Sequence, residues 1–354
     1  MKNLKVKLIS FLMLTFVMVS CGSDEPIAIT PPLNEVLENL NNGIMEGKLS
    51  EDYTLDPTIQ YSLRGAFIIE NNGILTIPAG TIITADSGGT EVYIAVLQGG
   101  EININGNAGN PVVMSSATGS PGDWGGLTLC GNASTTAGVD ASAEVGGFIY
   151  GGTDDVDSSG IIRYLQIVGT GAQINPESQY NGISFYGVGS GTLVDHIAII
   201  NGSDDGVEFF GGTVAVSNLY LENNDDDSID WTEGWSGTVT NAYISHTIAG
   251  FSTAFEGDKD NANPTFTNIT AVSYVGGTAL QFKKESGATI SGLRLVGYDV
   301  DLDMKDNGAL SNVQIDGTIA DAVLYAGETN KYKLNSGNDA LPLDVSRWSW
   351  IRAY

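Results

Sequence analysis

Six acidic side chains occupy equivalent positions in two successive repeats near the middle of the chain. Each repeat contributes three at a constant interval: Asp204, Asp205 and Glu208 in the first, and Asp226, Asp227 and Asp230 in the second. Two unit charges about 5 Å apart repel by about 3 kcal/mol at an effective dielectric constant of about 20, so the cluster should hold a proton or a cation. Ca²⁺ binds about six to eight oxygen atoms, which carboxylates and turn carbonyls supply. The spacing therefore predicts a Ca²⁺ site at these six residues.

Two other interpretations of these acids stay open. Aspartates bond their own backbone in turns, which accounts for any single Asp of the cluster. It accounts less well for Glu208 and Asp230, because the alternation of side chains places both on the outer surface of a strand, where acidic residues are unfavourable. The catalytic interpretation makes this pair the acid and base of a glycoside hydrolase.

Two basic residues are candidate bases for a polysaccharide lyase, in which Ca²⁺ neutralises a uronate carboxylate and a basic side chain removes a proton. Lys283 follows the equivalent strand two repeats after Asp230, about 10 Å away at the spacing of parallel strands. Arg294 projects outward from the next strand. The simpler alternative is that both are solvated charges that offset the acidic surface. The pattern specifies no base or nucleophile, so the catalytic residues stay unassigned.

Three aromatic residues are candidates for sugar binding, which needs flat apolar surface beside hydrogen-bonding groups. Tyr220 and Tyr243 are predicted to point outward and to stack between adjacent repeats, and Trp235 lies in the turn after Asp230. We expect these rings to form a polysaccharide-binding surface beside the acidic cluster.

A repeat of about 22 to 26 residues must position these groups. Short apolar segments return at this interval between Ile183 and Tyr325, as ISF, VEF, IDW, AFE, LQF, LDM and VLY, and a second strand follows each of the first six. The repeat predicts an all-β fold, a single-stranded right-handed parallel β-helix over residues 52–354. We expect its core to contain the inward side chains of Phe185, Phe209, Trp231, Phe282 and Met304.

Two further features concern the turns and the ends of the coils. A ladder of stacked asparagine side chains is predicted one residue before the first buried position of the second strand, at Asn218, Asn241, Asn268 and Asn312. His196 and Gly292 occupy the same position in their coils. A short helix is expected at 33–40, and the aromatic segment 344–354 is expected to cap the last coil. The Gly-rich excursion 132–159 interrupts the stacking, and such a loop either shapes a site or is a tolerated insertion.

The first residues have the composition of a secretory signal. Three lysines precede an apolar run from Leu8 to Val19, and Ser20-Cys21-Gly22 follows. The sequence VMVSCG resembles a bacterial lipobox, which implies a signal peptide at 1–20, lipid attachment at Cys21 and a tether with an N-terminal cap at 21–51. The acidic SDE that follows resembles the surface-export tether of Bacteroidota-type lipoproteins. We therefore expect an outer-membrane protein that faces outward.

The charge balance limits the possible partners. The whole chain has a formal charge of −27, and removal of residues 1–20 takes away three lysines and no acid, which leaves 12 basic and 42 acidic residues and a charge of −30. This negative charge disfavours nucleic acid and anionic lipid headgroups as partners, because it repels them. An acidic polysaccharide is repelled too, unless a divalent cation lies between the two. We expect a monomer.

Several stretches together resemble a group of β-helix lipoproteins of Bacteroidota and related bacteria: ENNGILTIPAGTII, GDWGGLTLCGNA, YGGTDDVDSSGIIRYLQI, NGISFYGVGSGTLVDHI, SDDGVEFFGGTV and DDDSIDWTEGWSG. The resemblance covers nearly all of the mature chain. It implies a pectate-lyase-like superhelix and a location in the cell envelope, and it implies no particular reaction or catalytic residue.

The favoured hypothesis is a cell-surface lipoprotein that binds an extracellular or envelope polysaccharide with the help of Ca²⁺. The first alternative is an enzyme, either a polysaccharide lyase or a glycoside hydrolase, that uses the same acids. The second is a structural or adhesive envelope protein without a small ligand.

Overall fold

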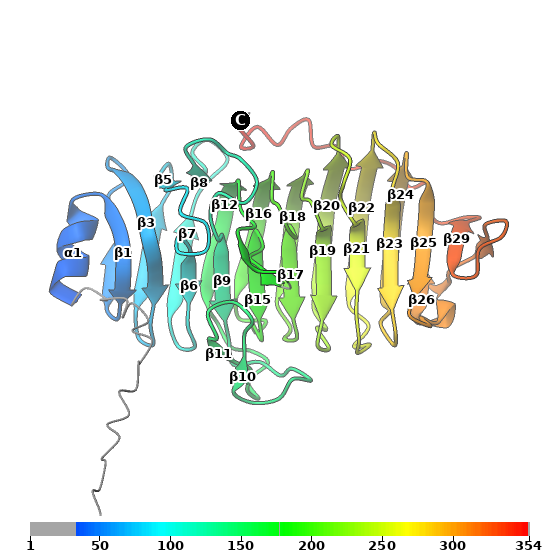
Figure 1. Ribbon diagram of the computed structural model, residues 1–354, viewed down its shortest axis with the longest axis horizontal. Helices are drawn as coiled ribbons and strands as arrows, with labels where there is room; N and C mark the ends of the chain where they lie inside the picture. The colour runs from blue at the N-terminus through cyan, green and yellow to red at the C-terminus, as the bar shows by residue number, and fades with distance from the viewer. Residues whose placement is uncertain (1–32, 177, 353–354) are drawn as a thin grey trace, which may run out of the picture. The chain divides into compact units, whose positions relative to one another are not determined.

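The computed structural model describes residues 33–176 and 178–352. The predicted signal peptide, Cys21 and residues 22–32 of the predicted tether lie outside the described residues. One short helix, α1 (Leu33–Asn41), lies at the first end of a stack of β-coils and buries Val36 and Leu40 there, as predicted (Figure 1). In the part of the chain that the structure describes, no helix is long and apolar enough to cross a membrane.

Each regular coil begins with a strand of one parallel sheet, which we call the front sheet and which faces the viewer in Figure 1. Its strands pair in chain order from the last part of β3 (Gln60–Ile69) onward. They are β6 (Ile94–Val96), β9 (Leu127–Cys130), β15 (Ile183–Tyr186), β17 (Val207–Phe210), β19 (Asp227–Thr232), β21 (Thr253–Gly257), β23 (Thr278–Lys283) and β25 (Val300–Lys305).

A longer strand completes each coil and contributes to two further sheets. These long strands are β12 (Gly160–Val168), β16 (Leu193–Ile200), β18 (Ala215–Glu222), β20 (Thr238–His246), β22 (Thr265–Ser273) and β24 (Ala288–Val296). Each bends at one residue with positive φ, so its first part belongs to a second sheet and its last part to a third.

The first coils carry the same three sheets on shorter strands. These are β1 (Ile44–Leu49), β2 (Asp52–Thr54), β3 (Gln60–Ile69), β4 (Ile74–Pro78), β5 (Ile82–Ala85), β7 (Glu101–Asn105) and β8 (Val112–Ser116). The strand β1 already pairs in parallel with β3, so the stacking starts about one strand before the predicted boundary at Asp52.

The coils stack in register, and this creates the core. Phe185 pairs with Phe209, which pairs with Trp231, and the rings of the first two stack with centroids 5.1 Å apart. All five predicted inward residues are buried. The next position of this column is Gly257, where a Cβ would lie 2.6 Å from the Trp231 ring. The predicted fold class and the predicted interval between successive coils are confirmed.

The ladder at the bend between the second and third sheets is confirmed in its central part. Asn241 Nδ2 donates to Asn218 Oδ1 at 3.0 Å, and Asn268 Nδ2 donates to Asn241 Oδ1 at 2.6 Å. These residues have φ between 55° and 59°, a region that asparagine tolerates. The ladder starts at Asp195, whose Oδ1 accepts from Asn218 Nδ2. The prediction for Asn312 is wrong, because its amide bonds the Glu285 carbonyl instead.

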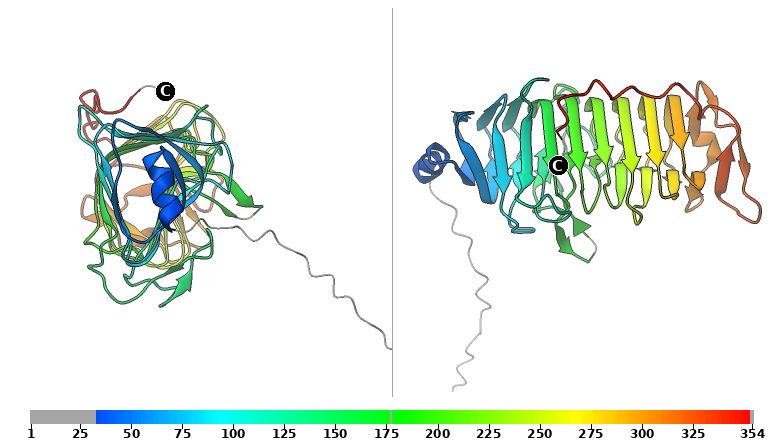
Figure 2. Two further views of the ribbon diagram at one scale, coloured as in Figure 1. Left: turned by 90° about the vertical axis from the view of Figure 1, so that its left-hand side faces the viewer. Right: turned by 90° about the horizontal axis from the view of Figure 1, so that it is seen from above.

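The C-terminal segment does not cap the last coil, contrary to the prediction. It runs back along the third sheet (Figures 1 and 2). Leu343 N donates to Thr270 Oγ1, and Arg352 pairs through its backbone with both amide atoms of Gln166, which lies in a much earlier coil. Trp350 is buried there against Tyr164. Aromatic composition indicated burial but not the surface that provides it.

The last coil is closed by antiparallel pairing. The segment VLY was expected to be a seventh parallel strand, but β28 (Ala322–Leu324) pairs antiparallel with β29 (Lys331–Leu334), and β29 pairs antiparallel with β25. The short elements η1 (Leu310–Asn312), β26 (Val313–Ile315) and β27 (Thr318–Ile319) fill the remaining part of this end.

Substitution of Asn241 by Ala should lower the free energy of unfolding by about 2 kcal/mol, because it removes one donated and one accepted hydrogen bond of the ladder. Asn241→Gly is the control, since glycine keeps the positive φ without strain and loses only the amide. Thermal or urea unfolding measures both. An unchanged midpoint in Asn241→Ala would contradict a stabilising ladder.

Candidate functional site

The outward side chains of the front sheet form one row across the coils. The pairing is Ser184 to Glu208, Glu208 to Asp230, Asp230 to Glu256, Glu256 to Gln281, and Gln281 to Asp303. We call this the acid row. Its neighbours along the strands are the inward residues, so the predicted direction of Glu208 and Asp230 is confirmed. The row is longer than predicted, because Glu256 and Asp303 belong to it as well.

Acids from the turns before the strands join one end of the row. Single carboxylate oxygens of Asp204, Asp205 and Asp226 all lie within 4.8 Å of one another, and so do those of Asp205, Glu208 and Asp230. Asp205 belongs to both groups and is buried, and its Oδ1 accepts a hydrogen bond of 2.8 Å from Asp227 N. The structure therefore brings five of the six predicted metal ligands together.

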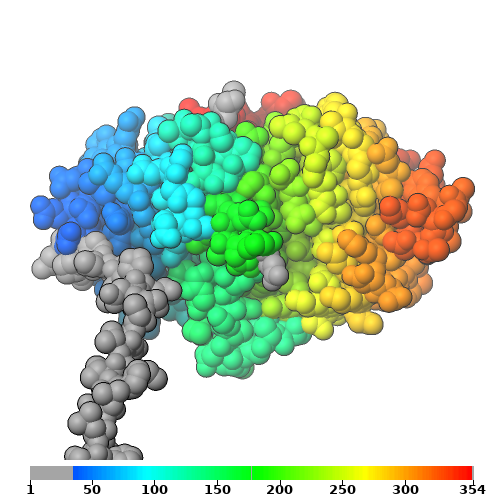
Figure 3. Space-filling view, viewed as in Figure 1, coloured from blue at the N-terminus to red at the C-terminus, as the bar shows by residue number. Residues whose placement is uncertain are grey.

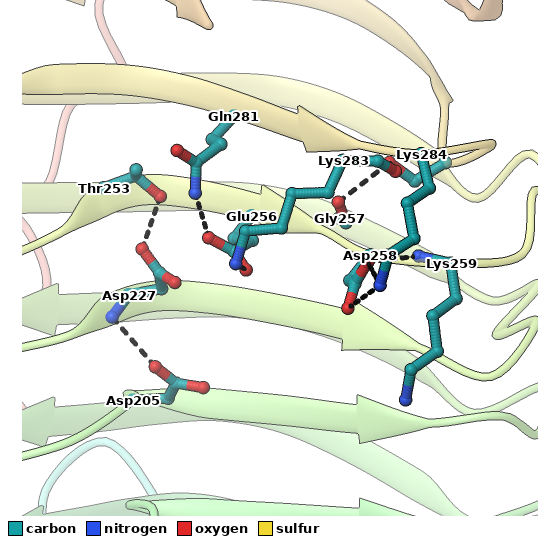
Figure 4. A network of polar contacts seen from close by, with 11 residues as sticks. Asp205, Asp227, Thr253, Glu256, Gly257, Asp258, Lys259, Gln281, Lys283 and Lys284 are labelled. Carbon is teal, nitrogen blue, oxygen red and sulfur yellow. Dashed lines mark hydrogen bonds and ion pairs between the residues drawn. The ribbon is translucent and has the colours of Figure 1, made fainter. Parts of the chain in front are cut away.

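Asp227 is the sixth predicted ligand, and it does not join them. Its Oδ1 accepts a hydrogen bond of 2.5 Å from Thr253 Oγ1, and its side chain is buried beneath the next coil (Figure 4). The stacking places it between Asp205 and Thr253, so its carboxylate is directed along the stack rather than into the space that the other acids share.

The clustered acids line the floor of a pocket of about 310 Å³. Its walls come from two insertions that stand out from the coils in Figure 3. One is the excursion with β10 (Ala141–Ser142) and β11 (Ile149–Tyr150), which contributes Glu144. The other is the hairpin of β13 (Gln173–Asn175) and β14 (Ser178–Gln179), which contributes Pro176, Ser178 and Gln179. None of the described residues that line the pocket is basic.

Hydrogen bonds hold the excursion over the front sheet. Glu233, in the turn after β19, accepts from Tyr150 Oη at 2.7 Å and from Thr135 Oγ1 at 3.0 Å. Thr136 Oγ1 donates to Asp260 Oδ2 at 2.6 Å. The question left open by the sequence is thus answered, since the excursion shapes the acidic pocket. Glu144 was missed because it lies far from Asp204 along the chain, in a segment without repeat periodicity.

Burial and the repulsion of neighbouring charges raise the pKa of four carboxyls of the pocket and make them hard to ionise. Burial, followed by the charge of Asp226, raises the pKa of Asp204 to about 8. Burial raises the pKa of Asp205 well above its usual value, and the charge of Glu208 adds to this effect. The pKa of Glu208 and that of Asp230 are raised in the same way. Carboxyls with raised pKa values carry protons near neutral pH unless a bound cation replaces those protons.

Hydrogen-bond donors satisfy only part of this carboxylate set. Asn181 Nδ2 donates to Glu208 Oε2 at 2.7 Å. Asp230 Oδ1 is buried, and no donor within the described residues bonds it. A buried carboxylate oxygen without a partner costs free energy, so the site favours an added proton or cation.

Lys283 is the predicted basic residue that does reach the acid row. Its Nζ forms an ion pair with Glu256 Oε1, and Gln281 Nε2 donates to Glu256 Oε2 (Figure 4). The pairing of β19 with β21 and of β21 with β23 places Lys283 two coils beyond Asp230, as predicted, and its side chain extends back by one coil to Glu256. The next residue, Lys284, pairs with Asp258, with Nζ 3.0 Å from Oδ1, and does not reach the acid row.

Arg294 and the aromatic candidates do not lie beside the pocket. Arg294 is on the third sheet, where Nη1 donates to the carbonyl of Ala340 in the C-terminal segment. Tyr220 and Tyr243 stack as predicted, with centroids 5.6 Å apart at 9°, but on the third sheet as well. The prediction that these residues share one surface with the acids is therefore wrong.

Trp235 is a core residue rather than a sugar contact. It is fully buried, stacks on Phe209 with centroids 4.1 Å apart, and donates from Nε1 to the carbonyl of Val214 at 3.1 Å. Its position in a turn suggested exposure, but the turn folds its ring inward over the core.

Comparison with known proteins bears on the fold. A family model described as a pectate-lyase-like β-helix domain matches residues 47–345, a range that includes the acid row and both walls of the pocket. Comparisons with curated proteins and with solved structures gave no match.

The raised pKa of Asp204 predicts that stability falls as pH rises. The pKa is about 8 when folded and near 3.8 when unfolded, so the folded state binds more protons between these values. Between pH 7 and pH 8 in EDTA we expect this carboxyl to lower the free energy of unfolding by about 1 kcal/mol. Thermal unfolding at the two pH values measures this change. Burial lowers the pKa of His246 to about 4, so its opposite effect lies mainly below pH 6.5.

Asp204→Asn is the matched control and should reduce this slope. A melting temperature that stays constant or rises between pH 7 and pH 8 in the unsubstituted protein would contradict the prediction.

Proposed function

The chain belongs to the family of pectate-lyase-like β-helix domains, and from that premise we propose that its acidic pocket binds Ca²⁺ and, through it, an acidic polysaccharide. One observation carries the proposal. Two groups of three carboxylate oxygens, each within 4.8 Å, share Asp205 at the floor of a walled pocket. Like charges at this separation repel strongly in a partly buried site, and a divalent cation relieves the repulsion.

Calcium fits the donor set better than other common cations. The described lining offers carboxylate, hydroxyl and amide oxygens and contains no His or Cys, which disfavours zinc. Ca²⁺ accepts about six to eight oxygens in flexible geometry, whereas Mg²⁺ requires near-octahedral geometry. Asp204, Asp205, Glu208, Asp226 and Asp230 would hold the ion, and Glu144 approaches from the excursion.

The polysaccharide part of the proposal is supported by charge and shape. The chain carries a formal charge of −27, so a glycan with carboxylate groups approaches this pocket only when a cation bridges the two. A Ca²⁺ ion held by the pocket carboxylates would supply that bridge. Extracellular modules bind Ca²⁺ with dissociation constants of about 10⁻⁴ to 10⁻³ M, which suits the surroundings of a surface protein.

The proposed location follows from the first residues of the chain. A lipid on Cys21 would hold the protein at the outer face of the outer membrane, and residues 22–32 would link it to the β-helix as a monomer. A glycan outside the cell would then reach the pocket directly.

Calorimetric titration of residues 22–354 with Ca²⁺ tests the metal site. We expect binding heat in the unsubstituted protein and at least a tenfold weaker affinity in Glu208→Gln/Asp230→Asn, which removes two ligands. Glu35→Gln/Glu38→Gln on α1 is the matched control, because it removes the same charge from exposed positions at the end of the stack. Equal binding heats in all three proteins would show that Ca²⁺ binds outside the acidic pocket.

Binding of polygalacturonate or alginate, measured with and without EDTA, tests the glycan. We expect retention on the immobilised polysaccharide in Ca²⁺ and its loss in EDTA. Ca²⁺ binding without any retention would refute the glycan part and favour a structural or adhesive envelope protein.

One observation favours an enzyme as the second candidate. A carboxyl with a pKa of about 8 beside other carboxylates is the arrangement in which one group acts as general acid. Assays for unsaturated products and for new reducing ends distinguish a lyase from a hydrolase. Asp204→Asn should abolish product formation while the glycan still binds if this candidate is correct.

A further inference from the structure

The surroundings of the acid row differ on the two sides of Asp230, because in the described part of the chain a basic side chain contacts the row only at Glu256. These two residues pair in register on neighbouring strands, and Glu208 precedes them in the row. Three acids on successive coils lie about 4.8 Å apart at the backbone, a spacing at which like charges repel. Each step of the row therefore requires a source of positive charge.

A side chain of the protein supplies that charge at the step from Asp230 to Glu256. The Lys283 ammonium group forms an ion pair with Glu256 Oε1, and Gln281 occupies the other oxygen. The Glu256 side chain is 7% exposed and that of Lys283 is 23% exposed. Figure 4 shows the lysine side chain lying along the strand with its amino group at Glu256. Both oxygens of this carboxylate are thus engaged within the protein.

The step from Glu208 to Asp230 has no such group. The pocket is lined there by acids and neutral residues alone among the described residues, and Asp230 Oδ1 is buried without a hydrogen bond. The row is therefore divided into a half that opens into the pocket and a half that a lysine neutralises. The two halves meet at Asp230.

From this division we infer that the Lys283 ammonium group takes the place of a divalent cation at Asp230 and Glu256, and thereby limits the number of metal ions that the acid row binds. The inference rests on the proposed Ca²⁺ site for the pocket half, and it assigns Lys283 as the residue that sets stoichiometry. Without the lysine, Asp230, Glu256 and the nearby Asp227 present carboxylates with no internal cation.

Calorimetric titration of residues 22–354 with Ca²⁺ alone tests the inference. Lys283→Met keeps the unbranched chain as far as the ε position and removes the ammonium group, and we expect it to bind one more Ca²⁺ ion per chain than the unsubstituted protein. Lys283→Arg keeps the charge and should bind the original number. Lys283→Met/Glu256→Gln removes a carboxylate of the added site and should also return to the original number.

Lys283→Gln serves as a second variant if Lys283→Met fails to fold in EDTA, because glutamine can still donate to Glu256. The same gain of one ion is expected. Unchanged stoichiometry in a folded charge-removing variant would overturn the inference even if the pocket binds Ca²⁺. Absence of Ca²⁺ binding in the unsubstituted protein would instead refute the proposed function. A Ca²⁺ ion bound by Lys283→Met alone would in that case still support the role of the lysine.

Discussion

The register between neighbouring coils is the constraint on which the rest of the structure depends. Each residue of the front sheet lies beside its counterpart in the next coil, at the spacing of parallel strands. Inside the helix this puts Phe185, Phe209 and Trp231 into one column, where stacking is favourable. Outside it puts Glu208 beside Asp230, where stacking is unfavourable. The same register between coils therefore produces both the core and the acid row.

The protein relieves the repulsion of the acid row in different ways along its length. Asn181 donates to Glu208, Lys283 and Gln281 engage Glu256, and Asn330 Nδ2 donates to Asp303 Oδ1. At Asp230 the relief is incomplete. The unrelieved part is also the part that the two insertions surround, so the local cost in free energy coincides with the pocket. Functional sites commonly combine unfavourable local interactions with a pocket in the protein surface.

The repeat allowed much of this to be predicted, and the errors concern features that the repeat does not fix. The constant interval placed Glu208 opposite Asp230 correctly, and the same reasoning could have found Glu256 in the next strand of the sheet. Trp235 lies in a turn, and whether a turn ring faces the core or solvent depends on the neighbouring coils. Arg294 is an outward residue as predicted, but the bend of each long strand places it on a different sheet from the acids.

The β-helix, the stacking of its core and the pairing of the acids could be derived from the repeat alone, because residues one repeat apart become neighbours on adjacent coils. Three features of the site depend on contacts in the folded chain: Glu144 joins the pocket, Asp227 turns away from it, and Lys283 reaches Glu256. The reason is that insertions and long side chains are placed by contacts between distant segments, which no periodicity encodes.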